Sequence, residues 1–405
     1  MVAVLRQVVL VGLWMLAALA GLCIAYLMML TLAALSQRRR IAWASSSPAT
    51  RFFVLIPAHN EEALLPELLS SLRAMDYPRS LYEVHVVADN CTDATAAVAR
   101  RHGVHVHERQ NETARGKGHA LNWLQSRLAP KLEHGTAVLI LDADSIPSPN
   151  LLQVMDAHLS GGESIVQAYY TVRGVENSWP AAMRALALSM VHYVRPLGRM
   201  ALGGSCGLKG NGMVFASEML GQGAWSEALA EDAELHVRLL LNGRRVTFAP
   251  DAVVAAEMPS SLATSRSQNV RWERGRLEVA RAYLRPLLSK AWQERRWLYA
   301  DAAIELLIPP LSLMGIASAI PLLGGAILSA PALAWVSAAT TVLLAVHIVS
   351  APLIAQAPLR VLAAGLYAPI YAAWKLWLYV RVLAGKDRAG WTRTPRNAPS
   401  EARKP

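Results

Sequence analysis

Cysteine and charged residues are scarce in this sequence. Only three cysteines, Cys23, Cys91 and Cys206, occur among 405 residues, and no two of them have the CxxC spacing. They therefore imply neither a disulfide framework nor a zinc site. Charged residues make up 17% of the chain, whereas 54% of it is hydrophobic. The positions of the apolar residues are thus the first guide to the class of protein.

Charge is entirely absent from two long stretches. Residues 8–35 contain no charged side chain and exceed the roughly 20 residues that a helix needs to cross a bilayer. A signal peptide is the alternative, but its apolar core would have only about 7 to 15 residues. Residues 306–359 suffice for two further passes, joined by a turn near GGAILSAP at 324–331. We expect an N-terminal anchor over 1–45 and a C-terminal membrane region over 306–384.

Basic residues set the expected orientation. Three arginines, 38–40, follow the first span, and the positive-inside rule places the chain beyond them in the cytoplasm. The apolar run 361–374 is ambiguous in length, and a full span there would put the basic polar tail, 385–405, outside. We therefore expect an interfacial or re-entrant segment. The protein should be a multi-pass protein of the cell membrane, typically a bacterial inner membrane, with a cytoplasmic domain.

Residues 286–305 mix Trp, Tyr and Leu with Arg and Lys. This pattern predicts an amphipathic helix at the cytoplasmic surface, with its basic residues near anionic lipid head groups. A plain connector between domain and span is the alternative.

The intervening part, residues 50–285, is typical of an α/β domain. Short apolar runs such as FFVLIPA at 52–58, YEVHVVAD at 82–89 and AVLIL at 137–141 alternate with helical patterns. Runs that are apolar throughout predict a mainly parallel sheet covered on both faces. Ligands of such sheets bind beyond the carboxyl ends of the strands.

Three of these strands end in polar residues: HNEE at 59–62, DNCTD at 89–93 and DADS at 142–145. Taken alone, Asn60 or Asp93 is better explained as a helix N-cap, because Asn and Asp are favoured there. Three such endings at one edge of a sheet favour a site.

Asp142 and Asp144 form a D-x-D pair. Along an extended chain these positions share a face, and two carboxylates on one face repel each other unless a cation lies beside them. Hard oxygen ligands suit Mg²⁺ or Mn²⁺, which typically also bind phosphate oxygens. The pair therefore predicts a metal and a phosphorylated ligand.

Basic residues precede the next helical pattern, in TARGKGHALNW at 113–123. Arg115 and Lys117 at a helix N-terminus could cradle a phosphate, and a solvated turn explains them equally well. The spacing fits neither the ATPase P-loop nor the dinucleotide-binding glycine motif.

Two later helical segments carry candidate residues. Glu231 and Asp232 fall in the first turn of a predicted helix, where the helix dipole also favours acidic side chains. Gln268, Arg271 and Trp272 have the i, i+3, i+4 spacing of one helical face. Such a face could bind a pyrophosphate through Arg and stack a sugar on Trp, or it could lie at a membrane surface.

The ordered set IPAHNEE, VVADNCTD, RGKGHAL, LDADS, GNGMVF, AEDAEL and QNVRW resembles membrane-bound family 2 glycosyltransferases. These have a GT-A fold and include the cellulose, hyaluronan and poly-N-acetylglucosamine synthases and ceramide glucosyltransferase. The resemblance covers about residues 50 to 285. His59 departs from it, because an aromatic residue often precedes N-E there. Only one span precedes the domain, which puts a polymer channel in doubt.

The resemblance implies roles for individual residues. The donor nucleotide would be contacted by Asp89 at its uracil and by Lys117, near the Asn60 and Glu61 segment. The metal and donor diphosphate would be bound by the D-x-D pair, and catalysis would fall to the E-D motif with Asp232 as base. Gln268, Arg271 and Trp272 would lie at the donor pyrophosphate and the acceptor. The full set is Asn60, Glu61, Asp89, Lys117, Asp142, Asp144, Glu231, Asp232, Gln268, Arg271 and Trp272.

The chemistry of these groups predicts a single displacement with inversion. A metal, helped by Arg271, would neutralise the departing diphosphate, and Asp232 would deprotonate the acceptor hydroxyl. The expected donor is a UDP-sugar and the acceptor a membrane-associated lipid or polysaccharide, with membrane lipids and polysaccharide-export proteins as partners. The alternatives are an NDP-sugar nucleotidyltransferase and a non-catalytic membrane scaffold. A net charge of +11 without a nucleic-acid-binding motif predicts no nucleic-acid partner.

Overall fold

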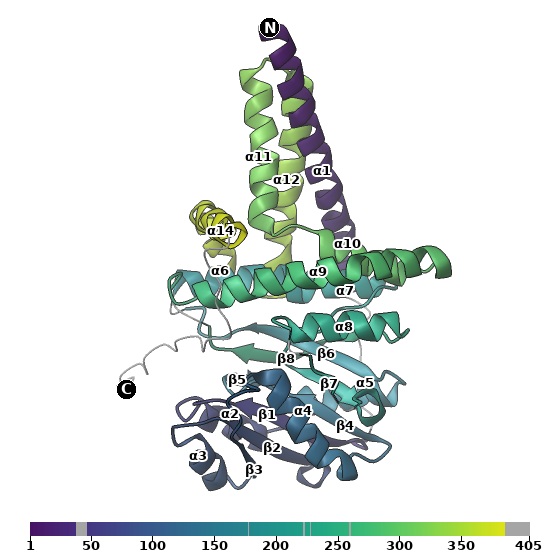
Figure 1. Ribbon diagram of the computed structural model, residues 1–405, viewed down its shortest axis with the longest axis vertical. Coiled ribbons are helices and arrows are strands. Elements are labelled where there is room, and N and C mark those ends of the chain that lie inside the picture. The colour runs from purple at the N-terminus through teal and green to yellow at the C-terminus, as the bar shows by residue number, and fades with distance from the viewer. Residues whose placement is uncertain (38–46, 177, 222, 227, 259–260, 385–405) are drawn as a thin grey trace. The chain divides into compact units, whose positions relative to one another are not determined.

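The structure is a computed structural model that describes residues 1–37, 47–176, 178–221, 223–226, 228–258 and 261–384 (Figure 1). It has two compact units. The α/β unit consists of the chain between the first helix and Gly174, together with Gly203–Ala303. The helical unit consists of the first helix, Val175–Leu202 and the described residues from Ile304 on. The arginines at 38–40 and the tail at 385–405 lie outside the described residues.

The α/β unit contains an eight-stranded sheet with the order β3-β2-β1-β4-β7-β6-β8-β5. Strands β1, β2, β3 and β4 pair in parallel, as do β6 and β8, whereas β7 pairs antiparallel with β4 and β6, and β5 with β8. The predicted mainly parallel sheet is therefore confirmed. The strands are β1 (Arg51–Ala58), β2 (Tyr82–Asp89), β3 (His105–Arg109), β4 (Thr136–Ile140), β5 (Ser145–Pro147), β6 (Ile165–Val172), β7 (Met213–Ala216) and β8 (Thr247–Ala256).

Helices cover this sheet in the alternation that the sequence pattern predicts. Strands β1, β2 and β3 are each followed by a helix, which is the connection that parallel neighbours require. The helices of this unit are α2 (Leu65–Arg73), α3 (Thr95–Arg101), α4 (Lys117–Leu128), α5 (Leu151–Ser160), α8 (Glu231–Leu241), α9 (Arg266–Glu294) and α10 (Trp297–Leu307), the last of which leads into the helical unit.

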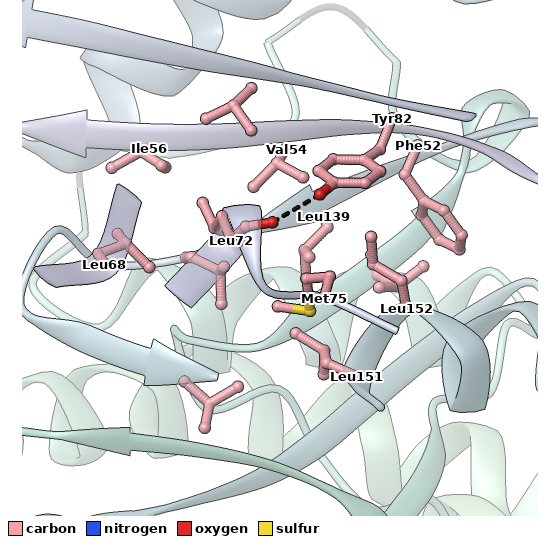
Figure 2. Close-up of a cluster of buried hydrophobic side chains, with 14 of the residues drawn as sticks. Phe52, Val54, Ile56, Leu68, Leu72, Met75, Tyr82, Leu139, Leu151 and Leu152 are labelled. Carbon is pink, nitrogen blue, oxygen red and sulfur yellow. Dashed lines mark hydrogen bonds between the residues drawn. The ribbon is translucent and has the colours of Figure 1, made fainter. Parts of the chain in front are cut away.

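One hydrophobic core lies between β1 and helices α2 and α5 (Figure 2). Phe52, Val54 and Ile56 alternate along β1 and are each fully buried, because alternate side chains of a strand point to the same face. The Tyr82 hydroxyl donates a hydrogen bond of 2.6 Å to the Leu72 carbonyl, which satisfies its polar atom inside the apolar cluster.

The helical unit is built on three long apolar helices. These are α1 (Val2–Gln37), α11 (Leu311–Ile327) and α12 (Pro331–Ile354), accompanied by α6 (Trp179–Leu188), a π-helical turn (Ser189–Val194), α7 (Arg195–Ala201), α13 (Leu359–Ala363) and α14 (Ala368–Leu383). Helix α7 packs against α1 where a Cβ on Gly198 would collide with the carbonyl of Leu30. Ile24, Leu27 and Leu344 form part of the apolar contact between α1 and α12.

Three helical segments among the described residues are long and apolar enough to cross a membrane: Val2–Gln37, Pro331–Ile354 and Leu359–Val382. Helices α10 and α11 together would add a fourth if they form one broken span. The predicted turn between two passes is present, because α11 ends at Ile327 and α12 begins at Pro331. The last segment is longer than the apolar run 361–374, because its helix continues to Leu383.

The predicted interfacial segment 286–305 is divided between two helices. Helix α9 extends to Glu294 and α10 begins at Trp297. Arg295, with a left-handed φ of 52°, ends α9. A location of this segment at the membrane surface remains a prediction.

Candidate active site

Asp89 lies at the carboxyl end of β2 and is buried. Arg109 pairs with it in the register of β2 and β3 and donates a hydrogen bond of 2.5 Å to its Oδ1. Asn90 donates to the same oxygen over 3.1 Å. The sequence predicted Asp89 but missed Arg109, whose signal is a basic residue at the matching end of the next strand, HVHER.

Asn60 and Glu61 hold the loops after β1 and β2 together. Asn60 has a left-handed φ of 57°, and its Oδ1 accepts a 2.8 Å hydrogen bond from the backbone N–H of Thr92. The N–H of Glu61 donates to Thr95 Oγ1, also over 2.8 Å. Asp93 accepts from the N–H of Thr95, the first residue of α3, although the N-cap residue of that helix is Ala94. Asn60 shapes this edge of the sheet through its own amide.

Lys117 is the first residue of α4 and reaches two groups from other elements. Its ammonium forms an ion pair with Asp142 and donates to the carbonyl of Gly210. Arg115, the other predicted phosphate ligand, lies instead 3.6 Å from the exposed Glu112. The structure therefore separates the two basic residues of this segment, and only Lys117 contacts a predicted metal ligand.

Asp142 and Asp144 lie in a turn between β4 and β5 rather than on an extended chain. The N–H of Ser145 donates to the carbonyl of Asp142 over 3.1 Å, so the argument for a shared face of a strand does not apply. Both carboxylates are nevertheless partly exposed. Asn211 fixes both ends of this turn: its Oδ1 accepts from the Asp142 N–H over 3.2 Å and its Nδ2 donates to Ser145 Oγ over 2.7 Å.

The glycine-rich segment before β7 allows this close approach. Gly210 has a φ of +79°, and a Cβ there would lie 3.3 Å from Asp232 Oδ2. Gly212 has a φ of +66°, and its Cβ would lie 2.9 Å from side-chain carbons of both Ala168 and Val254. Only glycine combines this backbone conformation with the missing side chain. The loop thereby brings Gly210 close to Asp232 and its carbonyl to the ammonium of Lys117.

Glu231 and Asp232 begin α8, as predicted. Burial, and then the neighbouring Asp232, raise the pKa of Glu231 to about 7, although Lys117 and Arg271 act against this increase. Burial also raises the pKa of Asp232, against the influence of the helix N–H groups, Lys117 and Lys209. The two carboxyl groups are therefore stronger proton acceptors than ordinary acidic side chains.

Helix α9 carries Gln268, Arg271 and Trp272 in its first two turns. It lies along α8 (Figure 1), and the contact is close because a Cβ on Gly275 would lie 2.6 Å from Ala230 Cβ. This contact, one turn after Arg271, brings the guanidinium near enough to influence Glu231. Trp272 is 37% exposed, so its indole is accessible to a ligand.

The structure thus brings together part of the predicted set. Ion pairs, hydrogen bonds and electrostatic influence join one group around Lys117, consisting of Lys117, Asp142, Gly210, Glu231, Asp232 and Arg271. Asp144, Gln268 and Trp272 lie on the turn and the helix that carry members of this group. Asn211 and Arg109 are the residues that sequence reasoning missed.

Residues 48–275 match the family model described as "Glycosyltransferase like family 2". Because the match covers more than half of the chain, the protein belongs to this family, and the resemblance drawn from the motifs is confirmed.

Curated relatives include β-monoglucosyldiacylglycerol synthases. The protein of Synechocystis sp. is 26% identical over 66% of this chain and 56% of its own length. That of Nostoc sp. is 30% identical over 55% of this chain and 48% of its own length. The probable glycosyltransferase YdaM of Bacillus subtilis is 25% identical over 57% of this chain and 56% of its own length. The chain thus spans about half the length of the curated relatives it matches.

A solved structure confirms the GT-A fold. The mannosyltransferase PcManGT of Pyrobaculum calidifontis, solved in complex with GDP-Man and Mn²⁺, has a TM-score of 0.53 and 18% identity, and the similarity covers 94% of this chain and 100% of that one.

Proposed function

We propose that the protein is an inverting, metal-dependent glycosyltransferase that moves a sugar from a UDP-sugar to a membrane-associated lipid. The supporting observation is that Lys117 contacts both Asp142 and the carbonyl of Gly210, and that Gly210 also lies beside Asp232, beyond the carboxyl end of β4. This is the edge of an α/β sheet where ligands bind, and it combines acidic groups for a cation and a proton with basic groups for a diphosphate.

The donor would lie along this edge of the sheet. Asp89, fixed by Arg109, is suited to accept a hydrogen bond from a uracil N–H. Lys117 and Arg271 supply positive charge for the diphosphate, and Arg can bind phosphate oxygens through two parallel hydrogen bonds. Gln268 and the exposed face of Trp272 would contact the pyrophosphate and the sugar.

The D-x-D turn fits a hard divalent cation. Asp142 and Asp144 offer partly exposed carboxylate oxygens, and Asp142 already has a cation beside it in the Lys117 ammonium. Oxygen-only ligands match Mg²⁺ or Mn²⁺. Such an ion would supply charge neutralisation at the leaving diphosphate.

Asp232 would act as the general base. Its Oδ atom takes the proton of the acceptor hydroxyl, the hydroxyl oxygen attacks the anomeric carbon, and the bond from that carbon to the diphosphate breaks. Because attack and departure occur on opposite sides of the carbon, the anomeric configuration inverts. General-base catalysis contributes typically about 10²- to 10⁴-fold. The raised pKa of Asp232 supports this role.

We infer a lipid acceptor from two observations. The helical unit has segments long and apolar enough to span a membrane, and the curated relatives are named for a glucosylated diacylglycerol. Glucosyl transfer to diacylglycerol in the cell membrane is therefore the first reaction to test, with Mg²⁺ and Mn²⁺ compared. A polysaccharide acceptor is the alternative, and only that reaction would call for polysaccharide-export partners.

The test uses the full chain, purified in detergent. Labelled UDP-glucose, UDP-galactose and UDP-N-acetylglucosamine are each incubated with diacylglycerol and with a total lipid extract, and the products are identified by mass spectrometry. We expect a glycolipid that forms only with a divalent cation. Formation of a UDP-sugar from UTP and a sugar phosphate would identify a nucleotidyltransferase instead. If neither reaction occurred and UDP also failed to raise the melting temperature, the proposal would be refuted.

A further inference from the structure

A second group of potential metal ligands lies on β2 and β3, away from the D-x-D turn. Glu83 and His85 alternate along β2, and His105 and His107 alternate along β3. His85 and His105 are direct neighbours in the parallel register, so the four side chains share one face of the sheet. The candidate metal atoms of Glu83, His85 and His105 all lie within 4.8 Å of one another.

We propose that Glu83, His85 and His105 form a binding site for a borderline transition-metal ion such as Zn²⁺. Glu83 Oε2 lies 3.3 Å from His85 Nε2 and 3.7 Å from His105 Nε2. Bonds of about 2.0–2.1 Å at tetrahedral angles separate two ligand atoms by about 3.3–3.4 Å, which is close to both distances. Two imidazoles and one carboxylate form a ligand set that Zn²⁺ commonly takes, with water in the fourth position.

His107 supplies the outer support that such sites usually have. Its Nε2 lies 3.1 Å from His85 Nδ1. If His85 carries its proton on Nδ1 and donates it to His107, the lone pair of His85 Nε2 points to the proposed ion.

The three proposed ligands range from a buried to an exposed side chain, as expected for an ion that binds at the protein surface. The side chain of His85 is 1% exposed, that of Glu83 19% and that of His105 57%. His85 and Glu83 would form the fixed part of the site, while His105 and the fourth position face water, which gives the ion a path of entry.

Two basic residues compete for the carboxylate. Arg51 forms an ion pair with Glu83 Oε1, and Lys131 Nζ lies 3.7 Å from Oε2. An ion on Oε2 would therefore displace the ammonium of Lys131, whose side chain is 55% exposed, and leave the Arg51 pair in place. Since β3 is an edge strand of the sheet, the ion would tie it to β2 with a link that does not depend on backbone hydrogen bonds.

Cobalt titration of the purified full-length protein tests the site, because Co²⁺ replaces Zn²⁺ in tetrahedral sites and gives strong visible absorption there. All titrations use an Asp142→Asn, Asp144→Asn background, which removes the D-x-D carboxylates. We expect one equivalent of Co²⁺ to produce these bands and Zn²⁺ to abolish them. His105→Gln should eliminate the bands, whereas His134→Gln, which changes an exposed histidine of the same unit, should retain them.

Two further results decide the assignment. Lys131→Met, which removes the competing ammonium, should tighten Co²⁺ binding severalfold if Glu83 is a ligand. In the same background, Zn²⁺ should raise the melting temperature of the parent protein but not of His105→Gln. Absence of tetrahedral bands in the parent, or equal bands in His105→Gln, would overturn the proposal, and so would unchanged binding in Lys131→Met.

Discussion

At the scale of single residues, the two adjacent carboxyl groups at the start of α8 have different surroundings. Asp232 lies beside the Gly210 loop, in reach of the charges of Lys117 and Lys209. Glu231 is influenced by Arg271 of α9 as well as by Lys117. When two carboxyl groups lie so close together, the negative charge of one makes ionisation of the other less favourable. We therefore propose Asp232 as the base and Glu231 as the group that modulates its pKa.

Asp232→Asn should bind UDP as tightly as the wild type but lose sugar transfer by at least about 100-fold, the lower end of what a general base contributes. The amide keeps the size of the side chain and removes its ability to accept the proton. UDP binding is measured by thermal shift and transfer by lipid-product formation. Asp251→Asn, at an exposed position with a raised pKa, is the matched control. Wild-type turnover in Asp232→Asn would refute the base assignment.

Glu231→Gln should change how stability depends on pH. The pKa of Glu231 is raised from 4.5 to about 7 in the folded protein, so between these values the folded state holds more protons than the unfolded chain. The free energy of unfolding then falls as pH rises through this range. Glutamine does not titrate, so the variant lacks this decrease in the free energy of unfolding. The melting temperature of the variant minus that of the wild type should therefore increase from pH 4.5 to pH about 8. A constant difference across the series would show that Glu231 has an ordinary pKa.

At the scale of elements, the site depends on a loop and a helix that position it from outside. Asn211 is fully buried and holds the backbone of Asp142 and the side chain of Ser145. Gly275 lets α9 approach the start of α8. Neither residue carries a charge, so neither is suggested by a search for acidic and basic groups.

Asn211→Ala should impair the metal-dependent part of donor binding. It leaves the partly buried N–H of Asp142 and the buried hydroxyl of Ser145 without their partner. An unsatisfied buried group costs about 1–3 kcal/mol, and the D-x-D turn can then shift. UDP with Mn²⁺ should therefore stabilise the variant less than the wild type in thermal shift. Asn242→Ala, which changes an exposed asparagine whose side chain donates to the Arg238 carbonyl of its own helix, should leave that stabilisation unchanged. Equal stabilisation of both variants would remove Asn211 from the site.

Gly275→Leu should weaken transfer by displacing α9. The added side chain collides with Ala230, and the helix must move away with Arg271 and Trp272. We expect a higher KM for the nucleotide-sugar together with a lower kcat, measured by product formation. Ala282→Leu, at an exposed position further along α9, is the control. Unchanged kinetic constants in Gly275→Leu would mean that α9 does not contribute to the site.

The sequence predicted those features whose pattern is local. FFVLIPA is apolar throughout because both faces of β1 are covered, and Glu231 and Asp232 stand at a recognisable helix start. The geometry of the D-x-D pair was not predictable, because the turn at Ser145 depends on Asn211, 66 residues away. The cluster of Glu83, His85 and His105 was hidden for the same reason: its histidines become neighbours only through the pairing of β2 with β3.

At the scale of the whole molecule, one hydrogen bond in the helical unit makes the predicted orientation in a membrane testable. Arg6, near the N-terminus, donates a hydrogen bond of 2.7 Å to the carbonyl of Leu328 in the turn between α11 and α12. The N-terminus and this turn thus lie at the same end of the α1, α11 and α12 bundle. The end with the single Arg6 would be outside, and the arginines at 38–40 would be inside, as the positive-inside rule requires.

Reporter fusions to truncated chains test this orientation. Alkaline phosphatase, which is active only outside the cytoplasm, should be active when fused after Ser329, in the turn between α11 and α12, and inactive when fused after Gln356, between α12 and α13. A fluorescent protein that folds only in the cytoplasm should give the opposite pattern and serves as the control. The reverse result for both reporters would put the α/β unit outside the cell, away from cytoplasmic nucleotide-sugars, and would contradict the proposed donor.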